Sequence, residues 1–231
     1  MSYSLEMCNY YTKREIKSKP IFLFDDHNMA LPIWGTYAAM YGPLNLVTFD
    51  THTDTHCAFT QLMQRYGKHS DYNYNKMLNT PEVKAYLTGM KYKREEFSFE
   101  DVYRYSFEIL NTEQILTGVA FGYLKSYTVR CHNEGYEEDD RQNGYDATYL
   151  CDSDKRTPLI RIPLVLDIDL DFFRTPAELD DTFLNYIQPC FDTACVVTIA
   201  REPRFFASER EDEKFTNKEA ESMLLDLFNR L

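Results

Sequence analysis

Short apolar runs alternate along this chain with segments whose apolar residues recur at helical spacing. The runs are rich in β-branched and aromatic residues and end in polar or turn-forming residues, which is typical of buried strands. Strands are predicted at residues 21–24, 44–49, 115–124, 164–173 and 194–200. Helices are predicted at residues 31–41, 98–111 and 175–187, and two more begin near residues 80 and 216. Because strands and helices alternate, the pattern indicates an α/β fold with a mainly parallel sheet flanked by helices.

Local signals support the ends of these helices. Ser98, Thr175 and Thr216 each precede an acidic residue by three positions, the arrangement in which a side chain caps a helix start. Pro176 would occupy a first helical position, and the Gly42-Pro43 pair would stop the helix at residues 31–41. Residues 125–156 form the least regular segment, and the acidic stretch 137–144 within it is predicted to be a solvated loop rather than a ligand site.

Composition narrows the class of protein. A chain of 231 residues suits one α/β domain spanning residues 1–231 and is short for two. Asp and Glu outnumber Lys and Arg by 37 to 25, and the formal charge of −12 argues against nucleic acid or an anionic membrane as partner. No apolar run reaches the roughly 18 residues of a membrane span, and no C-x-x-C pair occurs. We therefore expect a soluble cytoplasmic protein with reduced thiols.

Potential metal ligands occupy alternate positions directly after the predicted strand at residues 44–49. Asp50, His52, Asp54 and His56 follow one another at intervals of two, so in an extended segment they point to one face. Carboxylates and imidazoles at a buried strand end would repel one another unless a cation compensated them. The alternative is a solvated polar loop.

A second acidic cluster lies in the strand at residues 164–173, where Asp167, Asp169 and Asp171 alternate with apolar residues. The alternative is an edge strand that carries charge to resist aggregation. His27 and Glu202 also follow predicted strands. Because ligands bind beyond the carboxyl ends of parallel strands, we expect these segments to converge on one site.

Charge counting indicates two metal ions. Asp50, Asp54, Asp167 and Asp169 supply four negative charges, which two divalent cations would cancel, with His27 and His52 as neutral ligands. Mixed carboxylate and imidazole ligation favours manganese over zinc. A pair of such ions can activate water near neutral pH, which predicts a hydrolase.

The motifs resemble those of a known family. Residues 50–54 look like the D-x-H-x-D signature of the arginase and agmatinase superfamily, residues 167–169 like its D-x-D partner, and residues 26–28 like the segment that supplies its remaining histidine. Together with residues 50–56 and 167–173, they resemble most the small bacterial peptide arginases. Members of that group convert arginine side chains of ribosomally made precursor peptides to ornithine and release urea. The resemblance implies a three-layer arginase-like fold, two Mn²⁺ ions and a precursor peptide as partner.

The resemblance also implies roles for individual residues. One manganese would be held by His27, Asp50, Asp54 and Asp167, and the other by Asp50, His52, Asp167 and Asp169. Asp54 would pass a proton to the departing amine, and His69 or His56 would protonate the product, with His132 in reserve. Glu202 would pair with the guanidinium, and His56 could contact the substrate backbone. The chain departs from the free-arginine enzymes at Asp171, which follows Asp169 by two positions instead of three, with no proline after it and no serine before Asp167.

Three rival functions remain at this point. A hydrolase of a free guanidino compound, such as arginine or agmatine, would carry the same motifs, although this chain is short for that group. A zinc deacetylase of the related fold normally has adjacent histidines, which this sequence lacks. A metal-binding scaffold without turnover would keep the ligands and dispense with Glu202. The sequence does not indicate the oligomeric state.

Overall fold

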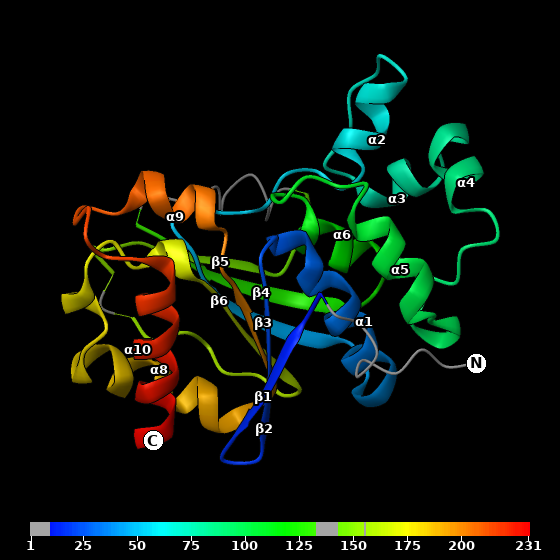
Figure 1. Ribbon diagram of the computed structural model, residues 1–231. Coiled ribbons are helices and arrows are strands. Elements are labelled where there is room, and N and C mark those ends of the chain that lie inside the picture. The colour runs from blue at the N-terminus through cyan, green and yellow to red at the C-terminus, as the bar shows by residue number, and fades with distance from the viewer. Residues whose placement is uncertain (1–9, 133–142, 155) are drawn as a thin grey trace.

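The fold is built on one seven-stranded sheet, with strand order β1-β2-β7-β6-β3-β4-β5 (Figure 1). The computed structural model describes residues 10–132, 143–154 and 156–231. Only the β1–β2 pair is antiparallel among the strand pairs of these residues, and the other five pairs are parallel. The strands are β1 (Thr12–Ile16), β2 (Lys19–Phe24), β3 (Leu44–Phe49), β4 (Leu124–Arg130), β5 (Ala147–Leu150), β6 (Leu164–Asp169) and β7 (Ala194–Ala200). The expected α/β fold with a mainly parallel sheet is confirmed.

Helices cover both faces of the sheet. The α-helices are α1 (Ala30–Tyr41), α2 (Thr60–Arg65), α3 (Tyr74–Leu78), α4 (Pro81–Leu87), α5 (Phe99–Ser106), α6 (Gln114–Ala120), α8 (Asp181–Thr193), α9 (Pro203–Glu209) and α10 (Asn217–Arg230). Figure 1 shows α1 and α5 on one side of the strands and α8 and α10 on the other. Within the described ranges, no helix combines the length and the apolar character needed to cross a bilayer.

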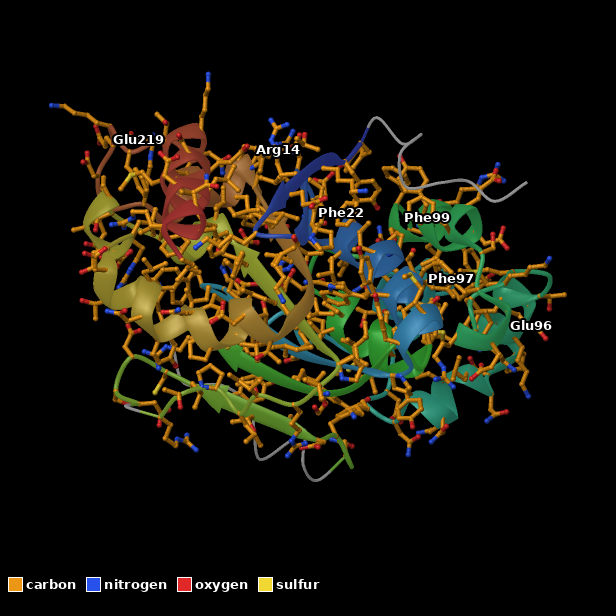
Figure 2. The ribbon with its side chains drawn as sticks, turned by 90° about the horizontal axis from the view of Figure 1, so that it is seen from below. Arg14, Phe22, Glu96, Phe97, Phe99 and Glu219 are labelled. Carbon is orange, nitrogen blue, oxygen red and sulfur yellow. The ribbon has the colours of Figure 1, made fainter. Side chains whose placement is uncertain are left out.

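The alternation of side chains along the strands explains the three layers. In β2, Phe22 and Phe24 belong to the core on the α1 side, whereas Ile21 and Leu23 belong to the core on the opposite side. Successive strand residues point to opposite faces, so a strand that is apolar at every position must be covered twice. In Figure 2, Phe22 lies toward Phe99 of α5, and Glu219 lies with α10 across the sheet.

Several predicted element ends are confirmed. The side chains of Ser98 and Thr216 accept hydrogen bonds from the backbone at Asp101 and Glu219, as expected for N-caps of α5 and α10. Thr175 and Glu178 form the predicted capping box. That box opens only a short 3₁₀ turn, and α8 begins later, at Asp181, so the predicted helix start was too early.

Other predictions were wrong. Residues 115–124 were predicted as a strand, but residues 115–120 belong to α6, and β4 begins only at Leu124. Most residues of α6 are buried because the helix packs against α1 and β4. A short apolar run does not by itself distinguish a buried helix from a buried strand. Residues 125–156, predicted to be irregular, contain β5 and nearly all of β4, and β1 was not predicted. Most of the acidic stretch 137–144 lies outside the described residues.

The arrangement of strands positions the candidate site. The four central strands β2, β7, β6 and β3 are adjacent and parallel, and their carboxyl ends are in register. Phe24 pairs with Ala200, Ala200 with Asp169, and Ile168 with Phe49. The polar segments that follow these strands therefore meet at one edge of the sheet.

A candidate metal centre at the strand ends

His27 lies at the centre of a group of buried carboxylates. It sits in the 3₁₀ turn after β2 and is fully buried. Its Nδ1 atom is 3.0 Å from Asp54 Oδ2, 3.2 Å from Asp169 Oδ2 and 3.4 Å from Asp50 Oδ2. Asp50 and Asp54 come from the segment after β3, and Asp169 ends β6. The predicted convergence of these segments is therefore present in the structure.

Asp167 contacts the other nitrogen of the same imidazole. Its Oδ2 atom lies 2.8 Å from His27 Nε2. Thr48 Oγ1 donates to the same oxygen at 2.8 Å, and Thr198 Oγ1 donates to Asp167 Oδ1 at 2.5 Å, so both neighbouring strands hold this carboxylate. The structure thus brings Asp167 to His27, but on the side of the ring opposite Nδ1.

The second imidazole, His52, is near a carboxylate to which the resemblance gave no role. Its Nδ1 atom is 3.3 Å from Asp171 Oδ2 and 3.6 Å from Asp50 Oδ1. Asp171 is buried because the chain turns into a 3₁₀ helix (Leu170–Phe172) directly after β6. The two-residue spacing from Asp167 through Asp169 to Asp171 was the available signal, but the turn was not predictable from it.

The described residues include three groups that could hold a metal ion. Within each group the candidate ligand atoms lie within 4.8 Å of one another. The groups are His27 with Asp50 and Asp169, Asp50 with His52 and Asp171, and Asp169 with Asp171 and Glu202.

Three buried polar atoms at the site have no hydrogen-bond partner, namely His27 Nδ1, Asp50 Oδ2 and Asp171 Oδ2. Buried polar atoms are normally satisfied, so these orphans fit cation ligation. Nitrogen and carboxylate donors of this kind suit first-row divalent ions.

The pKa values show how strongly the site needs positive charge. Burial, followed by the charge of Asp50, raises the pKa of Asp54 to about 7. Burial and the neighbouring Asp171 raise the pKa of Asp169. Hydrogen bonds to Asp171 and Asp50 raise the pKa of His52 to about 11. Carboxyls that retain protons near neutral pH, and an imidazole that holds its proton, indicate an excess of negative charge that divalent cations would cancel.

Glu202 lines a cavity beside this cluster. It follows β7, is only 7% exposed, and its Oε1 atom accepts hydrogen bonds from His27 N at 3.0 Å and Asn111 Nδ2 at 2.7 Å. Burial raises the pKa of Glu202 to about 8, and the charge of Asp54 adds to this rise. The cavity has a volume of 470 Å³, and Tyr10, Arg204 and Phe205 also line it. A planar cation could therefore meet a carboxylate at the inner wall.

The remaining histidines lie in different surroundings. His56 is exposed, and its Nδ1 atom is 2.6 Å from Thr112 Oγ1, on the segment that also carries Asn111. His69 is exposed in the loop between α2 and α3. His132 contacts the carbonyl oxygen of Phe172 at 2.7 Å and stacks on that ring. The structure thus brings His56 to the segment that contacts Glu202, whereas His69 belongs to a loop that supplies none of the clustered carboxylates.

Fold and site together define a class of protein. It is an α/β protein with a cluster of buried carboxylates, and with imidazoles, at the ends of its strands. No protein-family model matches the sequence, and no curated protein matches it. Among solved structures, the chain is similar to proclavaminate amidino hydrolase from Streptomyces clavuligerus, with 14% identity and a TM-score of 0.49. The match covers 91% of this chain and 63% of that enzyme, so the chain spans less than two thirds of its length.

Proposed function

We propose that this protein is a metal-dependent hydrolase that converts arginine side chains of a ribosomally made precursor peptide to ornithine, with release of urea. The observation that carries the proposal is the placement of Glu202, a buried carboxylate that lines a cavity and lies beside the clustered carboxylates around His27. Guanidinium is a planar cation and pairs with carboxylates through two parallel hydrogen bonds. The motifs at residues 50–54 and 167–169 support the same class of substrate.

Two manganese ions are the proposed cofactors. His27, Asp50 and Asp169, with Asp54 alongside, would hold one ion, and Asp50, His52 and Asp171 would hold the other. When bound, such a pair supplies a water molecule whose pKa is lowered enough for attack on a carbon centre. This assignment differs from the one that the resemblance implies, because the geometry favours Asp171 as a ligand and leaves Asp167 to orient His27.

The side chains around the ions have separate tasks in this proposal. Glu202 holds the guanidinium with its carbon toward the cluster. Asp54, which lies beside His27 at the proposed metal site, accepts a proton from the attacking water and passes it to the departing amine. His56, which is exposed and contacts Thr112, then protonates the ornithine side chain as it leaves.

The lining of the cavity favours a peptide substrate. A volume of 470 Å³ falls within the roughly 300–1,000 Å³ of small-molecule sites, so the cavity accepts an arginine side chain. Tyr10 and Phe205 line this space, and Phe205 is 46% exposed, so aromatic rings are available to a peptide.

One observation favours a free guanidino acid instead. Arg204 lines the same cavity two residues after Glu202, and its guanidinium could pair with the carboxylate of free arginine. Agmatine has no carboxylate and would not gain from this contact. A scaffold that binds metal without turnover would need neither Arg204 nor Glu202.

The test is a direct assay of the purified protein with Mn²⁺. An arginine-containing peptide, free arginine and agmatine are incubated separately, and urea and the mass change from guanidinium to amine are measured. We expect turnover of the peptide, its loss on chelation, and its loss in Glu202→Gln. The matched control is Glu219→Gln, on α10 across the sheet (Figure 2). Turnover of free arginine alone would remove the peptide reading, and turnover of none of the three would favour the scaffold.

A further inference from the structure

One short segment outside the sheet contacts two of the loops that carry site residues. Residues 109–114 form the end of the connection from α5 to α6 and the first residue of α6, on the α1 side of the sheet (Figure 1). Asn111 donates to Glu202 in the loop after β7, and Gln114 donates to Asp54 in the loop after β3. Between them, Thr112 bonds His56 twice, through its hydroxyl and through its carbonyl oxygen. The segment therefore connects loops that the strand order keeps apart.

Asn111 fixes one end of the Glu202 carboxylate. Its Nδ2 atom lies 2.7 Å from Glu202 Oε1, and the backbone N–H of His27 donates to the same oxygen at 3.0 Å. Both hydrogen bonds go to Oε1, so the orientation of the carboxylate is set from that side. The cavity is lined by both Asn111 and Glu202. The second oxygen, Oε2, is thereby available for a cation in the cavity.

Gln114 fixes Asp54 in the same way. Its Nε2 atom lies 2.5 Å from Asp54 Oδ2, the oxygen that also faces His27 Nδ1. Gln114 is fully buried in the first turn of α6, and its Oε1 atom has no hydrogen-bond partner. Burying an amide with one unsatisfied end costs free energy. The hydrogen bond from Gln114 to Asp54 offsets part of that cost.

Both carboxylates stand on strained backbone. Asp54 has φ of 49° and Glu202 has φ of 37°. These values lie in the left-handed region, which residues other than glycine rarely adopt. Strain of this kind persists only where surrounding contacts hold it, and it concentrates at functional sites. In this protein, Asn111 bonds Glu202 and Gln114 bonds Asp54, so each strained residue is held by its own amide side chain from the same segment.

The chemical type of the donors also matters. A lysine or arginine at position 111 or 114 would hold the carboxylates more strongly, but it would neutralise them and compete with a cationic ligand. A neutral amide orients a carboxylate and leaves its charge available. The arrangement suits two carboxylates that must both face a bound cation.

We propose that Asn111 and Gln114 are positioning residues that hold Glu202 and Asp54, from one segment, at fixed places on either side of a bound guanidinium. Asn111 acts on binding of the guanidinium, through Glu202. Gln114 acts on proton transfer, through Asp54. The inference rests on the proposed function, because it concerns the same substrate group.

The test separates these two effects by steady-state kinetics on the Mn²⁺-loaded protein. Leucine, which has similar bulk and no donor, replaces each amide, and Asn79→Leu and Gln64→Leu are matched controls at exposed sites outside the cluster. A hydrogen bond to a charged group is worth about tenfold to a hundredfold in an equilibrium or a rate. We expect Asn111→Leu to raise KM about tenfold or more with little change in kcat, and Gln114→Leu to lower kcat about tenfold or more with little change in KM.

Two further readouts exclude a purely structural effect. Because Asn111 acts through Glu202, adding Asn111→Leu to Glu202→Gln should weaken the binding of guanidinium no further. Calorimetric titration with guanidinium chloride should show weaker binding to Asn111→Leu than to Asn79→Leu, at equal metal content and equal Tm. If the wild-type protein releases urea and Asn111→Leu and Gln114→Leu match their controls, the inference is wrong and the proposed function stands. If the wild type releases no urea from any guanidino substrate, both fail.

Discussion

Asp167 accepts a hydrogen bond from Nε2 of His27 over 2.8 Å, on the side of the imidazole that faces away from Asp50, Asp54 and Asp169. A carboxylate at Nε2 keeps the ring proton there and leaves the Nδ1 lone pair for a cation. Thr48 and Thr198 hold the carboxylate from both neighbouring strands. Asp167 would therefore orient His27 from a position where it does not face the ion proposed at Nδ1.

This relationship predicts the effect of Asp167→Asn. The variant keeps the size of the side chain but weakens the acceptor at Nε2, so we expect Mn²⁺ affinity to fall about tenfold to a hundredfold. The number of ions bound at saturation should stay at two per chain, as measured by metal titration and elemental analysis. Loss of an ion at saturating Mn²⁺ would instead support Asp167 as a direct ligand, as the resemblance implies.

Asp171→Asn should behave differently. Its Oδ2 atom is buried, unsatisfied and 3.3 Å from His52 Nδ1, so removal of its charge weakens the group around His52 directly. We expect one ion per chain instead of two under conditions that saturate the wild type. Asp152→Asn is the control, because Asp152 is half exposed and contacts His132. If Asp171→Asn still binds two ions, Asp167 and not Asp171 is the ligand of the second ion.

The metal-free protein should lose stability as pH rises. Burial, followed by nearby carboxylate charge, raises the pKa of Asp54 to about 7 and of Glu202 to about 8. Hydrogen bonds to Asp171 and Asp50 raise the pKa of His52 to about 11. These groups bind protons more tightly in the folded chain than in the unfolded chain, where carboxyl and imidazole values are about 4 and 6.5. Their stabilisation is complete below the unfolded values and is lost as pH rises through the folded ones.

Thermal unfolding in the presence of a chelator measures this effect. We expect the Tm of the metal-free protein to fall between roughly pH 5 and pH 9. Because Mn²⁺ must displace the same protons, the rise in Tm on adding Mn²⁺ should grow over that range. A gain in Tm that is independent of pH would contradict cation binding to these groups.

The two candidate proton carriers are separated by His56→Asn and His69→Asn. His56 is anchored to the segment that contacts Glu202, whereas His69 lies exposed in the loop after α2. General acid catalysis contributes about a hundredfold or more to a rate, so His56→Asn should lower kcat by about that factor and His69→Asn should not. The pH profile of kcat should lose the ionisation of the proton carrier only in the variant that lacks that histidine. The opposite pattern would assign the role to His69.

Part of this architecture could be predicted from the sequence. The strands that carry the site are runs of β-branched and aromatic residues with polar residues after them, so β2, β3, β6 and β7 and their meeting point were recognisable. The gathering of Asp50, Asp54 and Asp169 around His27 follows from that geometry. Their role as metal ligands stays a prediction.

The rest depends on contacts that leave no local pattern. β4 carries Lys, Ser, Thr or Arg at four of its seven positions, and most residues of α6, polar ones included, are buried because neighbouring helices and strands pack against it. The place of Asp171 depends on a turn that begins after Asp169. Asn111 and Gln114 are ordinary loop and helix residues until the fold brings Glu202 and Asp54 to them.

The strand order has a consequence for how the protein matures. β6 and β7, from the last third of the chain, lie between β2 and β3, from the first quarter. During synthesis, the strands that precede His27 and Asp50 therefore lack the two strands between them until more than a hundred further residues have emerged. We expect nascent chains that end before β7 to remain aggregation-prone intermediates and to bind no manganese, so that metal uptake comes as the closing event of folding.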